Sequence, residues 1–285
     1  MLLYYPNDEK RYLNHMVTLD KYIKIIRAKG KSYFTKEQAL KDLQIKNDSL
    51  NARIYRLKQK GEIISPAKNL YVIVPPEYRN FGCTPAEELI PLLMKYKRVD
   101  YYACLLTAAM YHEASHQKPQ LFQVMTSKQL KPLSFGKVRI DFIYKKSFVN
   151  LPIQNINVKT GYLKVSSPEL TTMDLLLYPK HSGGLNHIAS ILSELVEAIN
   201  PEKLTAVAKV SGEKTWLQRL GYILDHINSI NNKKKKLIIS KLKKLLSKQK
   251  LVYMPLASEL PVKGCSRNDK WMIIENANIE SDYDS

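Results

Sequence analysis

A pair of histidines with metalloprotease spacing is the first feature that suggests chemistry. His112-Glu113-Ala114-Ser115-His116 matches H-E-x-x-H, in which two histidines on one helix bind zinc and the glutamate acts as general base. Pro119 ends any helix three residues later, and the longer metzincin pattern requires glycine at Pro119 and histidine at Phe122. No further glutamate follows until Glu169. We therefore predict no metal site here.

Asp141 and Lys159 are a second candidate for metal-dependent chemistry. They belong to consecutive predicted strands, where a nuclease would use carboxylates to bind Mg²⁺. Asn157 occupies the position that a second carboxylate should take. The structural interpretation, an edge-strand aspartate and a surface lysine, is therefore the better supported one.

Two further polar motifs have adequate structural explanations. Glu169 and Asp174 lie near the start of a predicted helix, where carboxylates offset the helix dipole. His181-Ser182-Gly183-Gly184 resembles a phosphate loop only loosely, because it lacks the lysine and the spacing of a nucleotide-binding motif, and it predicts a turn. The sequence therefore predicts no catalytic residue, no metal and no cofactor.

Arginines on one predicted helix indicate a different chemistry, the recognition of DNA. Arg53 and Arg56 carry guanidinium groups, which form paired hydrogen bonds with guanine edges and also grip phosphate. Other candidates lie on the same helix and on the hairpin after it, with the two lysines as phosphate contacts. They are Ser49, Asn51, Tyr55, Lys58 and Lys68.

The segment from Tyr33 to Tyr78 must position these side chains, and its pattern predicts a winged helix-turn-helix. Thr35 and Gln38 form a capping box that opens a short scaffold helix. After a tight connection, Asn47 or Asp48 is expected to cap the recognition helix. The apolar face of that helix is Leu50, Ile54 and Leu57, and Gly61 ends it.

A hairpin after the recognition helix is the predicted wing. Glu62–Ser65 and Leu70–Val74 are β-prone runs, and Pro66-Ala67-Lys68-Asn69 between them is the expected tip, which presents Lys68. The simpler alternative for the whole segment is a small helical domain with a hairpin and a solvated basic face.

Composition favours a polyanionic partner. The 285 residues include 45 Lys plus Arg and 26 Asp plus Glu, giving a formal net charge of +19. Cys83, Cys104 and Cys265 are too few and too widely spaced for a disulfide framework or a cysteine-based zinc site, so we expect packing residues. No apolar run approaches the roughly 18 residues that a bilayer span requires. We therefore expect no membrane partner and a cytoplasmic location.

Pro75-Pro76 is the best candidate for a linker, and it divides the chain into two expected domains. Residues 1–79 are predicted to form the winged helix-turn-helix domain. Residues 80–285 are predicted to form a mixed α/β domain, with a sheet in about residues 80–180, a helical bundle in about 181–250 and a terminal strand region in 251–285. The predicted fold class is therefore α+β.

Hydrophobic periodicity and residues typical of helix starts and ends predict the remaining elements. A helix over residues 8–29 is expected to brace the winged segment. Thr84-Pro85-Ala86-Glu87 combines a capping box with proline at the first helical position and should open another. The further predicted helices are Tyr101–His112, Pro168–Tyr178, 185–199, 201–210, 213–230 and 233–250. The predicted strands are Leu121–Met125, Lys137–Tyr144 and Ile153–Val158.

Basic side chains outside the winged segment are a second candidate surface, for RNA or for a protein partner. The helix predicted over residues 233–250 begins with four consecutive lysines and has an apolar stripe of Ile238, Leu242, Leu245 and Leu246. A packed helix with a solvated face is the simpler interpretation. The candidate residues are Lys131, Lys137, Arg139, Lys145, Lys146, Lys241, Lys243 and Lys244.

Six segments carry a resemblance through their order: RIYRLKQKGEIISPAKNLYVI, YYACLLTAAMYHEAS, VSSPELTTMDLLLYP, HSGGLNHIASILSEL, WLQRLGYILDHI and NDKWMIIEN. Taken in this order, they resemble the AbiEi family, the antitoxin and transcriptional regulator half of bacterial AbiE toxin-antitoxin systems. The resemblance covers nearly the whole chain. In the hairpin the family usually has a glycine before the tyrosine, whereas this sequence has Asn69 ahead of Leu70 and Tyr71; asparagine tolerates left-handed backbone, so the hairpin is expected to form.

The resemblance implies a winged-helix domain that represses its own operon, joined to a C-terminal domain that counters a nucleotidyltransferase-like toxin in abortive phage infection. The expected partners are operator DNA with inverted repeats and the cognate toxin, whose direct contact is left open, with RNA as a further candidate. Two alternatives also stay open. One is a nuclease-like, nucleic-acid-processing enzyme with a winged-helix targeting domain, and the other is a transcriptional regulator that senses a ligand.

Overall fold

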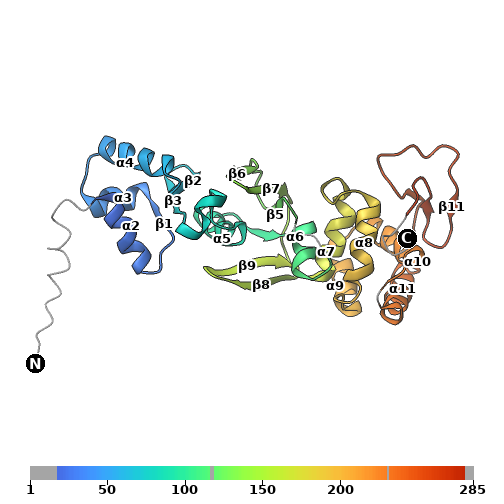
Figure 1. Ribbon diagram of the computed structural model, residues 1–285. Coiled ribbons are helices and arrows are strands. Elements are labelled where there is room, and N and C mark those ends of the chain that lie inside the picture. Colours follow the sequence, from blue (N-terminus) through green and yellow to red (C-terminus); the bar gives the residue numbers. More distant parts are fainter. Residues whose placement is uncertain (1–17, 116–118, 230, 280–285) are drawn as a thin grey trace, which may run out of the picture. The chain divides into compact units, whose positions relative to one another are not determined.

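The computed structural model describes residues 18–115, 119–229 and 231–279 and shows a mixture of helices and sheets (Figure 1). The mixed α/β content agrees with the prediction. The chain divides into two compact units. One contains the chain up to Val99 with Lys131–Asp141 and Asn157–Leu163; the other contains Asp100–Leu130, Phe142–Ile156 and the chain from Lys164 onward. In the described part of the chain, no helix is long and apolar enough to span a bilayer.

Three helices and three short strands make up residues 18–73, where the described part of the chain begins. The strands form an antiparallel sheet in the order β1-β3-β2. One hydrophobic core joins the elements, and it includes Leu19 of the first helix, Phe34 of the first strand and Leu50 of the third helix. In chain order the elements are α2 (Leu19–Ala28), β1 (Tyr33–Thr35), α3 (Lys36–Leu43), α4 (Asn47–Gln59), β2 (Ile63–Ala67) and β3 (Leu70–Ile73).

The capping box that opens α3 is present, since the Thr35 hydroxyl accepts from the Gln38 N–H and the Gln38 side chain accepts from the Thr35 N–H. The predicted cap of α4 was wrong. Lys46 is the N-cap and no side chain caps the helix, because Asn47 already has helical backbone. The helix predicted over residues 8–29 is present as α2 from Leu19, after the cap Thr18; its earlier residues lie outside the described part.

The hairpin also differs in detail from the prediction. Strand β2 continues through Pro66 to Ala67, with a register shift between Ile64 and Ala67, so the turn is Lys68-Asn69 and not four residues. Asn69 has φ of 63°, the left-handed conformation that asparagine was expected to supply. Strand β1, which pairs with β3, was not predicted, because three residues are too few to show a period.

A six-stranded sheet follows, in the order β6-β7-β5-β4-β9-β8. Strand β4 pairs antiparallel with β5 and parallel with β9, and β6 pairs antiparallel with β7. The elements of this region, in chain order, are η1 (Pro76–Phe81), α5 (Ala86–Lys97), β4 (Tyr101–Ala103), α6 (Leu105–Tyr111), β5 (Phe122–Thr126), β6 (Leu133–Phe135), β7 (Val138–Tyr144), β8 (Ile153–Val158) and β9 (Gly161–Ser166).

Two predictions in this region were wrong. Tyr101–Ala103, expected as the first turn of a helix, is strand β4, because it pairs with strands on both sides; only α6 of that helix remains. Pro85 is the N-cap of α5, so it is not the first helical residue, and Thr84 donates to the Glu88 side chain over 3.2 Å in place of a capping box. Strands β6 and β9 were not predicted.

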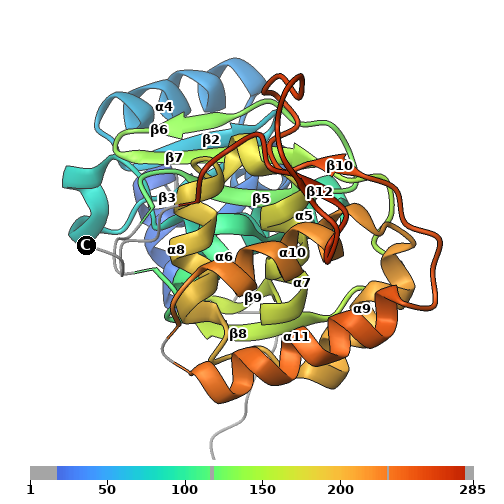
Figure 2. The same ribbon diagram turned by 90° about the vertical axis from the view of Figure 1, so that its right-hand side faces the viewer.

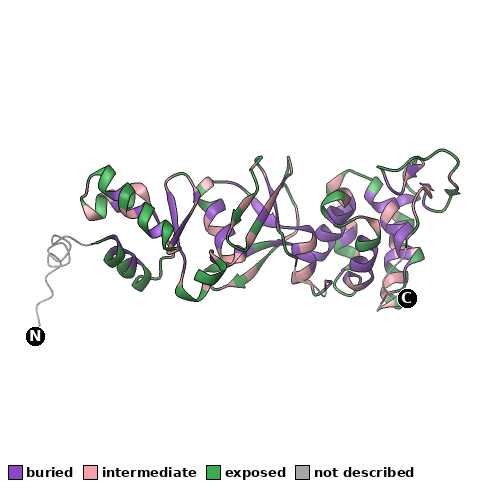
Figure 3. Cartoon of the chain, turned by 45° about the horizontal axis from the view of Figure 1, so that its top comes forward, coloured by how far each residue is buried: buried purple, intermediate pink, exposed green. Residues whose placement is uncertain are grey.

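Helices form the remainder of the described chain, with three short strands near its end (Figure 2). Several helices have a buried side and an exposed side, whereas Pro168–Leu176 of α7 are all buried (Figure 3). Cys83 and Cys104 are buried, as expected for packing residues, while Cys265 is partly exposed. The elements are α7 (Pro168–Leu177), η2 (Pro179–His181), α8 (Leu185–Leu195), α9 (Pro201–Ser211), α10 (Thr215–His226), α11 (Asn232–Leu246), β10 (Met254–Pro255), β11 (Arg267–Asn268) and β12 (Ile273–Ile274).

Trp271 fixes the terminal strands to α10. Its ring is buried, its indole N–H donates to Asp225, and its backbone oxygen accepts from the Gln218 amide over 3.0 Å. Gly221 permits the contact, because a Cβ at that position would lie 2.2 Å from the Trp271 ring.

We expect Gly221→Ala to lower the free energy of unfolding by about 1 to 3 kcal/mol, the usual effect of overpacking. Urea unfolding followed by tryptophan fluorescence measures the change. In a Trp271→Leu background, where the six-membered ring is gone, the same alanine should have little effect. An equal loss in both backgrounds would contradict the proposed contact.

Candidate nucleic-acid interface

One face of α4 carries the predicted DNA-contacting residues. The opposite face packs into the core through Leu50, Ile54 and Leu57, as the sequence predicted. This packing leaves Tyr55 64% exposed, and Arg56 is also exposed, whereas Arg53 is half-buried. The other predicted residues of the helix are also exposed: Ser49, Asn51 and Lys58.

The charges on this face are not neutralised within the protein. Among the described residues, no ion pair or side-chain hydrogen bond engages Arg53, Arg56 or Lys58. Acidic residues are sparse on α4, and Asp48 lies in its first turn, away from the basic last turn. A helix with free guanidinium groups on one side and a fully packed other side is suited to bind a polyanion, because its core contacts hold the helix in place.

The hairpin tip is held by three contacts within the same unit. The Lys36 N–H donates to the Asn69 carbonyl over 2.9 Å, and the Asn69 amide donates to Glu37 over 3.2 Å. The Tyr96 hydroxyl donates to the Lys68 carbonyl over 2.9 Å. These bonds fix the turn to the start of α3 and to Tyr96 of α5, while the Lys68 side chain stays exposed.

The other predicted basic residues have different environments. Lys131, Arg139 and Lys146 are exposed, and the Lys137 ammonium lies 5.5 Å from the centre of the Phe81 ring. On α11, Lys241 pairs with Glu202, whereas Lys243 and Lys244 are exposed. These residues do not form one cluster on a single element.

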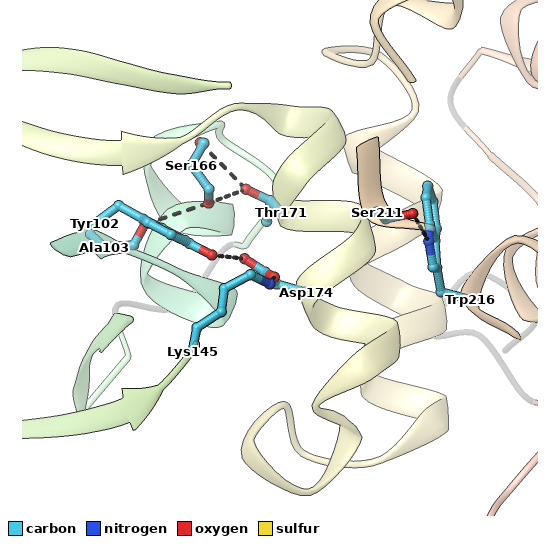
Figure 4. A network of polar contacts seen from close by, with 8 residues as sticks. All are labelled: Tyr102, Ala103, Lys145, Ser166, Thr171, Asp174, Ser211 and Trp216. Atoms are coloured by element: carbon cyan, nitrogen blue, oxygen red, sulfur yellow. Dashed lines mark hydrogen bonds and ion pairs between the residues drawn. The ribbon is translucent and has the colours of Figure 1, made fainter. Parts of the chain in front are cut away.

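Lys145 is a correction, because it does not belong to an exposed basic surface. Its side chain is only 14% exposed, and its ammonium donates to Asp174 over 3.0 Å (Figure 4). Asp174 is fully buried in the second turn of α7, so it does not offset the helix dipole as predicted. It also accepts from the Tyr102 hydroxyl over 2.9 Å. Glu169 accepts from the Ser167 hydroxyl and the Asn200 N–H.

Burial and charge act against each other in this network. Burial raises the pKa of Asp174 despite the stabilising charge of Lys145. Burial opposes the charge on Lys145, but the hydrogen bond and attraction to Asp174, together with the nearby Tyr178, outweigh it, so the pKa of Lys145 is raised. The network joins β4, the end of β7 and α7. No local sequence pattern indicates this network, because its members are separated by 29 and 72 positions.

His112 does not have the geometry of a zinc ligand on a helix. Helix α6 ends at Tyr111, and Glu113 has left-handed backbone with φ of 59°, so the i, i+4 spacing is not helical here. The ring is half-buried, its Nε2 lies 2.7 Å from the Ser166 carbonyl, and burial lowers its pKa. His116 lies outside the described residues.

The nuclease candidates also have structural roles. Lys159 donates to the Tyr78 hydroxyl over 2.7 Å and lies over its ring. Asp141 is on β7, which has β6 on one side and β5 on the other, so the expectation of an edge strand was wrong. Among the described residues, no group of three His, Cys, Asp or Glu side chains is arranged to hold a metal.

Comparison with known proteins identifies part of the chain. Residues 101–226 match the family model of the AbiEi antitoxin C-terminal domain. The resemblance to AbiEi antitoxins that was inferred from sequence segments is therefore confirmed over these residues. Among curated proteins, no sequence matches this chain.

Two solved structures match this chain to different extents. The RV2827C protein from Mycobacterium tuberculosis has a TM-score of 0.62 and 16% sequence identity, with 90% of each chain covered, which indicates a shared fold. An antigenic nucleotidyltransferase-like protein from Paracoccidioides brasiliensis has a TM-score of 0.28 and 11% identity, with 50% of this chain and 92% of that chain covered. The second value is too low to indicate a shared fold.

Proposed function

We propose that this chain is the antitoxin of a toxin-antitoxin pair and also a DNA-binding repressor of its own operon, because residues 101–226 match the AbiEi antitoxin C-terminal domain. The match to the antitoxin domain supports the antitoxin role. The exposed basic face of α4 supports the DNA-binding role.

The DNA-binding part is a winged helix-turn-helix. Its support is the order helix, strand, helix, helix, strand, strand from α2 to β3, with the three strands in one antiparallel sheet. In this arrangement α4 enters the major groove and the β2–β3 hairpin lies beside it. Arg53 and Arg56 contact base edges, with Ser49, Asn51 and Tyr55 as further contacts. Lys58 and Lys68 contact phosphates.

The antitoxin part counters a nucleotidyltransferase-like toxin that acts in phage defence, as the family resemblance implies. It acts by binding and not by catalysis. The division of labour follows the domains expected from the sequence, residues 1–79 for DNA and residues 80–285 for the toxin. The compact unit that contains α4 extends to Val99 and includes two later segments, so substitutions in the full chain are better tests than fragments.

We expect the full chain to bind inverted repeats upstream of its own gene far more tightly than random duplex DNA. Several phosphate contacts should make log K fall with log salt at about −0.9 per contact. Fluorescence anisotropy titrations at a series of salt concentrations measure both quantities. Equal affinity for operator and random DNA would overturn the repressor assignment, metal-dependent cleavage of the DNA would favour the enzyme alternative, and release by a small metabolite would favour the sensor.

A further inference from the structure

A basic groove lies between α9 and α11, far along the chain from α4. Its volume is about 270 Å³. Helix α9 contributes Glu202, Thr205 and Lys209, which share one face because they are three and four residues apart. Lys241 and Lys244 of α11 and Lys248 in the turn after it line the other side, with Leu245 as an apolar floor. The two helices pack against each other, and both appear in Figure 2.

Charge in the groove is positive and mostly unneutralised. Lys241 is paired with Glu202, the one carboxylate among the lining residues. The side chains of Lys209, Lys244 and Lys248 are exposed, and among the described residues they have no hydrogen-bonding or ion-pairing partner. Three free ammonium groups around one hollow repel each other, so an anion that lies between them is favoured.

The dimensions of the groove suit a single chain of phosphates. From Glu202 to Lys209, α9 advances by about 10 Å, at 1.5 Å per residue. Helices in contact are about 8 to 10 Å apart, so the seam between them is narrow and runs in one direction. Single-strand binding proteins use such positively charged grooves to follow one backbone. A flexible strand can place successive phosphates beside fixed lysines, whereas a duplex has fixed phosphate positions.

We infer that this groove binds the phosphodiester backbone of a single-stranded nucleic acid, at a site separate from α4. Lysines contact phosphates as point charges, and no aromatic side chain lines the groove for stacking on bases. Binding is therefore independent of base sequence. The inference goes beyond operator recognition and neutralisation of a toxin, and it does not depend on either.

The test uses the full chain and labelled oligouridine of about 12 nucleotides, within the site sizes of single-strand binding proteins. Lys244→Glu/Lys248→Glu is expected to weaken binding at least about tenfold and to make the salt slope shallower by about 1.4, at about 0.7 per lost phosphate contact. The matched control, Lys180→Glu/Lys263→Glu, makes the same change in net charge at exposed positions outside the groove and should have little effect.

A variant that should strengthen binding distinguishes loss of binding in the groove pair from misfolding of that variant. Glu202→Gln removes the carboxylate that holds Lys241 and should tighten oligouridine binding by about threefold, since the groove gains a free ammonium group. Oligothymidine of the same length tests whether the groove binds DNA as well as RNA. Equal affinity assigns the site to phosphates alone, and tighter binding of oligouridine assigns it to RNA.

Three results would overturn the inference. The control pair could weaken oligouridine binding as much as the groove pair, which would mean that overall charge alone attracts RNA. The groove pair could weaken operator binding as much as oligouridine binding, which would place operator DNA in the groove. Co-purification with the toxin could be lost while oligouridine affinity is unchanged, which would make the groove a protein interface. Arg53→Ala/Arg56→Ala should leave oligouridine affinity unchanged, so the failure of operator recognition is a distinguishable outcome.

Discussion

Lys145→Met is expected to lower the free energy of unfolding by about 3 to 5 kcal/mol at neutral pH, because it leaves the Asp174 carboxylate buried without a counter-charge. Asp174 is fully buried, so water cannot take the place of the ammonium group. The Tyr102 hydroxyl would remain as a donor, but one neutral hydrogen bond does not balance a full charge. Urea unfolding followed by circular dichroism measures the loss.

A matched control and a second variant make this prediction specific. Lys146→Met removes the same charge from an exposed neighbour and should change stability by no more than about 0.5 kcal/mol. Adding Asp174→Asn to Lys145→Met should recover part of the loss, since the amide is neutral. If Lys145→Met has no greater effect than Lys146→Met, the ion pair does not stabilise the domain.

Arg53→Ala/Arg56→Ala is expected to abolish discrimination between operator and random DNA. Each arginine that reads a base edge contributes about 1 to 3 kcal/mol, so the pair accounts for a loss of about 30-fold or more in specificity. The two substitutions leave the core-facing residues of α4 unchanged, so folding should be retained. Lys24→Ala/Arg27→Ala removes two exposed positive charges from α2 and serves as the control. Anisotropy titrations with both DNAs measure the difference, and unchanged discrimination would refute the assignment of α4.

Local features of the fold were predictable from the sequence. The apolar positions of α4 and the capping box of α3 depend on residues within one or two helical turns of each other, and both are present. The left-handed conformation of Asn69 was also predictable, because asparagine accepts positive φ, although the turn has two residues and not the four expected. The exposed side of α4 then follows, because fixing one face of a helix fixes the other.

Features set by distant partners were not predictable. Tyr101–Ala103 continues a helical pattern, yet pairing with β5 and β9 makes it a strand. Lys145 looked like any surface lysine, because only the fold brings it beside Asp174, 29 residues away. The lysines of α11 were predicted as a basic face, but the groove depends on the packing of α9, whose Lys209 and Glu202 gave no signal of their own.

The central proposal is that one chain carries two separate activities, DNA recognition through α4 and neutralisation of a toxin through residues 101–226, which match the AbiEi antitoxin domain. The most direct test is growth of cells that express the cognate toxin together with the full chain bearing Arg53→Ala/Arg56→Ala, at matched protein levels. The account predicts full protection from this variant, although it no longer represses a reporter under the operator. Loss of protection in parallel with loss of repression would contradict it, because the two activities would then depend on the same surface.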